Sequence, residues 1–173
     1  MIGAMVVDEK GIRLGKVYDV VIQKENKLFY IAKKGLRGEE YAVDPADILG
    51  SKDVVIVKKG EKISTAFWDQ AVCSLKSNKG KHLMDLGGRD WGELSQIISG
   101  EGGEPLFVTS GDTVVPSSLL RSIGDHIIVE SVPDQGPYKG PNAETETLAG
   151  SFRAKLSREK GKEEKEEEDK GKK

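Results

Sequence analysis

Short apolar runs rich in valine and isoleucine alternate with glycine, aspartate and asparagine through most of the chain. Runs of roughly four to eight such residues, bounded by turn formers, are typical of β-strands. The longest run, Val17–Ile22, is followed by a turn at Glu25–Asn26 and a second run, Leu28–Ala32. Pro45 and Pro116 cannot donate to a β-ladder, so each is predicted to end a strand. The pattern predicts a small, strongly bent sheet or a partly closed barrel.

The pattern of glycines and apolar residues occurs twice. Four turn-forming residues recur at one offset without a gap: Gly3, Asp8, Gly11 and Gly15 align with Gly80, Asp85, Gly88 and Gly92. After a change in length, Val55–Val57 matches Ile127–Val129. Such internal similarity indicates a duplicated fold. We therefore predict a mainly β chain with barrel repeats at 1–60 and 80–133, a helical connector at 61–79 and a low-complexity charged tail at 134–173.

The connector between the repeats has apolar residues at helical spacing. Ser64 or Thr65 can cap a helix, and the predicted apolar face consists of Phe67, Trp68, Ala71, Val72 and Leu75. A barrel of about 60 residues buries little surface alone and is only marginally stable. We expect this helix to pack between the barrels, with Cys73 as a buried, unreactive thiol.

The tail is rich in Lys, Glu and Gly but contains one stripe of apolar residues. Leu148, Phe152 and Leu156 follow each other at intervals of four, which places them on one side of a helix. The rest of the tail buries too little apolar area to offset its chain entropy, so it is predicted to be disordered or partly helical. The stripe is interpreted either as a helix end that touches the folded body or as a short motif that folds into a partner's groove.

Charge is distributed unevenly along the chain. The chain has 27 Lys and Arg against 29 Asp and Glu. Residues 1–60 have eleven against nine, 61–79 three against two, 80–133 three against eight, and 134–173 ten against ten. No predicted folded segment is strongly basic, which argues against a nucleic-acid platform. No apolar run reaches the roughly 18 residues of a membrane span, and the start does not resemble a secretory signal, so we expect a cytoplasmic protein.

Candidate chemistry is sparse. The single cysteine excludes an intramolecular disulfide, and His82 and His126, both on predicted strands, have no third ligand for zinc. Four aspartates lie beside turn glycines or at strand starts, where aspartate bonds the backbone, rather than in a catalytic pair: Asp8, Asp53, Asp85 and Asp125. We expect no catalytic residue, cofactor or metal, and therefore no enzyme.

The loop Lys33–Gly38 is the only basic cluster in the predicted folded part. A solvated hairpin tip explains it most simply, while contact with RNA or acidic lipid is the alternative. Trp91, which aligns with Leu14, is predicted to lie in the core. The candidate interface residues are Lys33, Lys34, Arg37, Phe67, Trp68, Leu148, Phe152 and Leu156.

Each repeat resembles the PRC-barrel domain, a fold shared by the cytoplasmic part of the reaction-centre H subunit and the C-terminal domain of the ribosome maturation factor RimM. The residues that carry the resemblance are Gly11–Ile22, Tyr41–Pro45 and Asp53–Val57, with Gly88, Gly92 and Gly124–Val129 in the second repeat. The second repeat departs from the pattern where Asp19 is replaced by Gln96. These are turn and core residues, so the resemblance identifies a fold and transfers no catalytic residue.

The resemblance implies a role in docking other proteins. Archaeal proteins with this domain are implicated in FtsZ-based cell division through the membrane-anchor protein SepF. The leading hypothesis is therefore a non-enzymatic adaptor in archaeal cell division, without a cofactor, recruited to the membrane or division site by its partner. The alternative is an accessory factor in RNA metabolism or ribosome maturation. The chain is expected to be a monomer if the repeats cover each other's dimer faces, and a homodimer otherwise.

Overall fold

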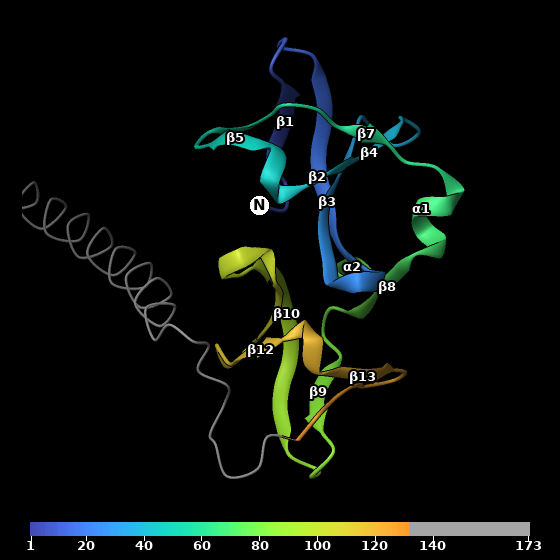
Figure 1. The fold of residues 1–173 in the computed structure, drawn as a ribbon, viewed down its shortest axis with the longest axis vertical. Helices are drawn as coiled ribbons and strands as arrows, with labels where there is room; N and C mark the ends of the chain where they lie inside the picture. Colours follow the sequence, from blue (N-terminus) through green and yellow to red (C-terminus); the bar gives the residue numbers. More distant parts are fainter. Residues whose placement is uncertain (132–173) are drawn as a thin grey trace, which may run out of the picture. The chain divides into compact units, whose positions relative to one another are not determined.

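The computed structural model describes residues 1–131, which lie within one compact unit, Met1–Pro137. The strands of these residues form two sheets, so the prediction of a mainly β fold is confirmed (Figure 1). The predicted tail and its apolar stripe, Leu148, Phe152 and Leu156, lie outside the described residues. The predicted division of the chain at residues 60, 79 and 133 stays a prediction.

The first sheet contains eight strands in the order β5-β6-β1-β2-β3-β4-β7, with β8 paired to one end of β2. Strands β1 and β6 are parallel, and the other neighbours are antiparallel. Short 3-10 turns at Lys24–Asn26 and Pro45–Asp47 connect strands. The strands are β1 (Met5–Asp8), β2 (Arg13–Gln23), β3 (Lys27–Lys33), β4 (Glu40–Val43), β5 (Ile48–Ser51), β6 (Val54–Val57), β7 (Glu61–Lys62) and β8 (Ala71–Ser74).

The second sheet repeats this arrangement with six strands. Its order, β13-β14-β9-β10-β11-β12, corresponds strand for strand to β5-β6-β1-β2-β3-β4, and β9 and β14 form the parallel pair. The 3-10 turns recur at Glu101–Gly103 and Ser117–Leu119. The strands are β9 (His82–Asp85), β10 (Asp90–Ser99), β11 (Pro105–Thr109), β12 (Val114–Pro116), β13 (Leu120–Ile123) and β14 (Ile127–Val129).

The expectation of barrels is corrected in one respect. Within residues 1–131, the end strands of each sheet do not pair with each other, so neither sheet closes into a barrel. The register shifts between Val17 and Asp19 and between Leu94 and Gln96, and such bulges bend and twist a strand. Bending without closure leaves edge strands that another segment can pair with.

The prediction of one continuous connector helix is wrong. The connector contains β7, then α1 (Thr65–Asp69), then β8, then α2 (Leu75–Asn78). Strand β2 extends beyond its pairing with β1, and β8 pairs with that extension from Val21 to Gln23. Strand alternation therefore leaves Val72 43% exposed while Cys73 is buried, so Val72 is not on a buried helical face.

The two sheets pack around one continuous apolar core. The same cluster of buried side chains includes Val17 and Val20 of the first sheet and Leu94 and Phe107 of the second. Helix α2 contributes Leu75 to this cluster and contacts both β2 and β10. A further link is a hydrogen bond of 2.5 Å from Ser117 Oγ to Asn26 Oδ1.

Candidate functional site

A buried carboxylate holds the connector against the first sheet. Asp19 is 3% exposed, and its side chain accepts hydrogen bonds from the backbone N–H of Lys76 at 2.8 Å and from Ser74 Oγ at 2.5 Å. It also accepts one from the backbone N–H of Val20 at 2.7 Å. Gln96, at the equivalent position of β10, is exposed. Gln96 therefore replaces the carboxylate in the second sheet, and the described residues of that sheet include no counterpart of β8.

The connector seals one face of the first sheet. This face, called the first outer face, is formed by Val21, Ile31 and Ala42, which are 0%, 0% and 5% exposed. Phe67 and Trp68 of α1 pack against it, and the ring of Phe67 meets that of Phe29 edge-on with centroids 5.4 Å apart. Two of the candidate interface residues, Phe67 and Trp68, are therefore half-buried and occupied within the chain.

The second sheet has an equivalent face that is less covered. Strand register places Ile98, Val108 and Val114 at the positions of Val21, Ile31 and Ala42. These three residues, called the second outer face, are only partly buried. Among residues 1–131 the second sheet has no elements equivalent to β7, α1 and β8. The structure thus contains one apolar face twice, once sealed and once partly open.

The loop between β3 and β4 carries three of the predicted interface residues. Lys33 forms an ion pair of 3.1 Å with Glu40, which also accepts a hydrogen bond of 2.8 Å from the Tyr18 hydroxyl. Burial, together with the bond to Glu40, raises the pKa of Tyr18. Lys34 and Arg37 are exposed and, among the described residues, form no ion pair. The structure therefore separates Lys33, which is held by the sheet, from two cations at the loop tip.

The same loop presents a leucine that the sequence reasoning did not select. Leu36 is 96% exposed. Two glycines allow the chain to pack closely here, since a Cβ at Gly15 would overlap the carbonyl of Lys33 and one at Gly38 would overlap that of Lys34. The sequence signal for this residue is a single leucine between Gly35 and Arg37, in a loop with no other apolar side chain next to it.

The last residue of this loop, Glu39, is held mainly by Lys62 and Tyr41. Glu39 accepts hydrogen bonds from Lys62 and from the Tyr41 hydroxyl. The bond from Lys62 is the main cause that lowers the pKa of Glu39 and, in return, raises the pKa of Lys62. The loop tip therefore combines a protruding apolar side chain with two cations.

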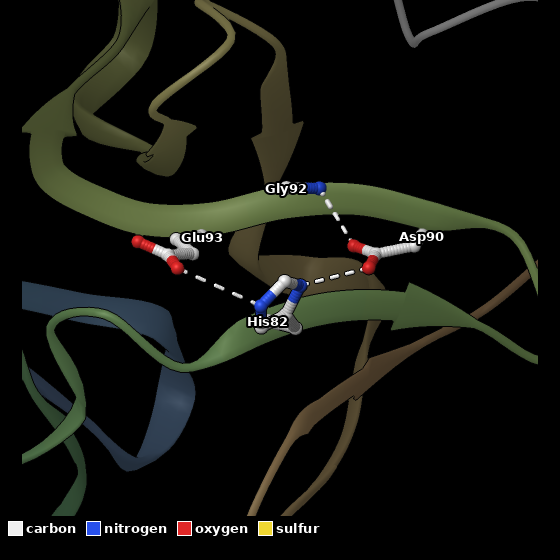
Figure 2. Close-up of polar contacts among 4 residues, drawn as sticks. All are labelled: His82, Asp90, Gly92 and Glu93. Carbon is white, nitrogen blue, oxygen red and sulfur yellow. Dashed lines mark hydrogen bonds and ion pairs between the residues drawn. The ribbon is translucent and has the colours of Figure 1, made fainter.

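Polar side chains gather on β9 and β10 of the second sheet (Figure 2). His82 Nδ1 lies 2.7 Å from Asp90 Oδ2, and His82 Nε2 lies 3.6 Å from Glu93 Oε1. The backbone N–H of Gly92 donates to Asp90 Oδ1 at 2.9 Å, and this bond is the main cause that lowers the pKa of Asp90. The ring of His126 stands edge-on to His82 with centroids 6.0 Å apart. His126 precedes β14 in a bend, which corrects its predicted place on a strand.

This cluster does not form a metal centre. Within the described part of the chain, no group of three or more His, Cys, Asp or Glu side chains is arranged to hold a metal ion. His82 is partly buried, its carboxylate partners are exposed, and their contacts bridge neighbouring strands. The arrangement joins β9 to β10 where bulges interrupt their backbone pairing.

Two further sequence expectations concern Cys73 and the turn aspartates. Cys73 is buried, although on β8 rather than on a helix, and burial raises the pKa of its thiol to about 12. Asp8 accepts hydrogen bonds from the backbone of Lys10 and Ile12, and Asp85 accepts one from Arg89. The turn role of these two aspartates is confirmed. Trp91 is only partly buried, stacking under Arg89 while it packs against the core.

Residues 1–63 match the family model of the PRC-barrel domain. The match covers the first sheet through β7 and stops before α1. No curated protein matches the sequence significantly. Among residues 1–131, no helix has both the length and the apolar character needed to cross a membrane.

Proposed function

We propose that this chain, whose residues 1–63 belong to the PRC-barrel domain family, is a non-enzymatic adaptor that binds other proteins. PRC-barrel domains are small β modules that often take part in protein interactions. Three ionisable groups of the described part have structural roles, which supports a non-enzymatic function. Asp19 holds the connector, His82 bridges two strands, and the Cys73 thiol is buried and neutral.

The observation that carries the proposal is the protruding loop between β3 and β4. Leu36 is 96% exposed in this loop, which packs closely against β2 beside Gly15. Burial of a leucine side chain in a partner contributes about 2 kcal/mol. The neighbouring cations Lys34 and Arg37 attract an acidic partner surface and increase its association rate. An exposed leucine between two cations is therefore suited to contact with a protein.

The direct experiment is quantitative capture of partners from the native organism with full-length chain. Leu36→Ser is compared with Leu49→Ser, because Leu49 is also an exposed leucine, 54% exposed on β5. We expect a protein that is retained at high salt by the natural chain and by Leu49→Ser, and is lost with Leu36→Ser. Equal capture by all three chains would contradict the role of the loop.

A finer proposal concerns the partner's identity. The family resemblance supports an adaptor of archaeal FtsZ-based cell division, in the cytoplasm and recruited to the division site through the membrane anchor SepF. Titration calorimetry of purified SepF and FtsZ against the full-length chain tests this. We expect saturable binding of one of them, weakened by Leu36→Ser. Failure of both to bind would remove the cell-division role and leave the adaptor role untouched.

The loop cations also favour a second candidate function in RNA metabolism or ribosome maturation. Lys34 and Arg37 form no ion pair within residues 1–131 and are open to phosphate. Binding to RNA through phosphate contacts weakens steeply as salt concentration rises. Retention on RNA that falls with salt and is lost in Lys34→Glu with Arg37→Glu would favour this function. Salt-insensitive retention of a protein would favour the adaptor.

A further inference from the structure

Within the described residues, the second outer face resembles a surface that is covered elsewhere in the same chain. Phe67 and Trp68 pack on its equivalent, the first outer face. Ile98, Val108 and Val114 are partly buried, while their counterparts in the first sheet are at most 5% exposed. The two faces share strand order and register, and among residues 1–131 only the first is covered by a segment that follows its sheet. Partly covered aliphatic residues that lie together on a sheet mark a surface where a further element can pack.

The first sheet shows what kind of segment this face accepts. Helix α1 places Phe67 and Trp68 over the first outer face, with the two rings edge-on and their centroids 5.5 Å apart. Helix α1 has only five residues, and Phe67 and Trp68 supply its aromatic contacts with this aliphatic face. The same floor is present in the second sheet, with isoleucine at 98 and valines at 108 and 114.

The net charge of the second repeat indicates the charge of the partner that this face would bind. Residues 80–133 contain three Lys and Arg against eight Asp and Glu. On β10 itself, the carboxylate of Glu93 is exposed. A basic segment is therefore attracted to this sheet, and an acidic one is repelled.

We propose that the second outer face binds an amphipathic helical segment of a protein partner, with two adjacent aromatic residues that pack on Ile98, Val108 and Val114 and basic residues at its rim. The proposal rests on the adaptor function and names the surface and the chemistry of the partner. It assigns the second sheet a binding role distinct from that of the loop tip at Leu36.

The probe is a fluorescent peptide of residues 61–79 of this chain with Asp69→Lys, because this sequence already covers the equivalent face. Fluorescence anisotropy is measured while full-length protein is added. We expect saturable binding that weakens at least about tenfold when Phe67 and Trp68 of the peptide are both replaced by serine, since aromatic pairs dominate such contacts. Val108→Arg in the protein is expected to weaken binding by a similar factor.

Controls separate a lost surface from a lost fold. Leu49→Arg introduces the same charge on the first sheet and is expected to leave peptide binding unchanged. Val114→Ser, a milder change, is expected to weaken binding about threefold while the urea midpoint of unfolding stays near that of the natural chain. A peptide that fails to bind full-length protein, or binds Val108→Arg as tightly as the natural chain, would overturn the proposal.

Sedimentation velocity tests whether a second copy of this chain, rather than a partner protein, covers the second outer face. A natural chain that is dimeric and becomes monomeric on Val108→Arg would show that a second copy covers the face, which also overturns the proposal. The capture experiment with Leu36→Ser reports on the adaptor function separately. Partner capture that depends on Leu36, together with failure of the peptide, would reject this surface while the adaptor function stands.

Discussion

The two sheets of this chain share strand order and differ in what covers them. In the first, β8 extends the sheet and α1 seals the first outer face, with Asp19 holding the connector in place. In the second, Gln96 replaces the carboxylate and the second outer face is only partly buried. The two copies share one β scaffold, while within residues 1–131 only the outer face of the first copy is covered by a following segment.

The loops at the ends of the sheets differ in the same way. The chain between β3 and β4 contains Lys34, Leu36 and Arg37, whereas the shorter turn between β11 and β12 contains Gly111 and Asp112. The last residue of β3, Lys33, also approaches β2 closely enough to exclude a side chain at Gly15. We therefore expect the first sheet to depend more strongly on its glycine and its buried polar contacts.

The largest expected difference is between the two equivalent glycines. Gly15 has φ +131°, and an added Cβ would overlap the Lys33 carbonyl. Gly92 has φ +101°, but an added Cβ would approach no atom closer than 3.6 Å. We expect Gly15→Ala to lower the free energy of unfolding by more than about 3 kcal/mol and Gly92→Ala by about 1 kcal/mol. Urea denaturation followed by circular dichroism measures both, and equal losses would break the comparison.

The next expected difference is between Asp19 and Gln96. Asp19→Ala leaves the donors of Ser74 and Lys76 without their acceptor in a buried place and releases β8 and α2. We expect a loss of about 3 kcal/mol for Asp19→Ala and under about 0.5 kcal/mol for the exposed Gln96→Ala. In Asp19→Ala, a protease added under native conditions should also cleave the connector faster than in the natural chain. A connector that resists cutting in this variant would show that Asp19 does not hold it.

A third pair compares the outer faces themselves. Ile31 is 0% exposed and Val108 is partly buried at the equivalent position. Ile31→Ala is expected to lower the free energy of unfolding by about 2.5 kcal/mol, and Val108→Ala by less than about 1 kcal/mol. Thermal unfolding of both variants provides the measurement. A loss for Val108→Ala as large as that for Ile31→Ala would mean that the second face is covered after all.

The smallest effect concerns pH and Cys73. Burial raises the pKa of its thiol from an ordinary value near 9 to about 12. The folded thiol therefore keeps its proton while the unfolded thiol ionises, so its contribution to stability is complete below pH 9 and declines as pH rises toward 12. We expect Cys73→Ala to remove this part of the alkaline decline, measured as urea midpoints from pH 8 to 10.5. An identical pH dependence in both chains would contradict it.

The scaffold was predictable because its signals are local. Turn glycines at a constant offset, such as Gly11 with Gly88, and prolines at 45 and 116 lie where the structure has turns and strand ends. The connector was mispredicted because Ala71–Ser74 forms a strand only where the free end of β2 offers a partner, which is a non-local contact. Its apolar spacing alone fits a helix equally well.

The candidate site was predictable only in part. The basic residues of the loop were visible as a cluster, but the separation of Lys33 from Lys34 and Arg37 depends on Glu40, across a strand pair. The exposure of Leu36 depends on whether any distant segment covers it, which sequence spacing does not show. Barrel closure failed as a prediction for the same reason, since it requires pairing between the ends of each sheet.

The unequal coverage of the two outer faces can be measured directly by methyl NMR of the full-length chain with a soluble paramagnetic agent. We expect strong broadening of the methyl signals of Ile98, Val108 and Val114 and little broadening of those of Val21, Ile31 and Ala42. Equal protection of the two sets would contradict it.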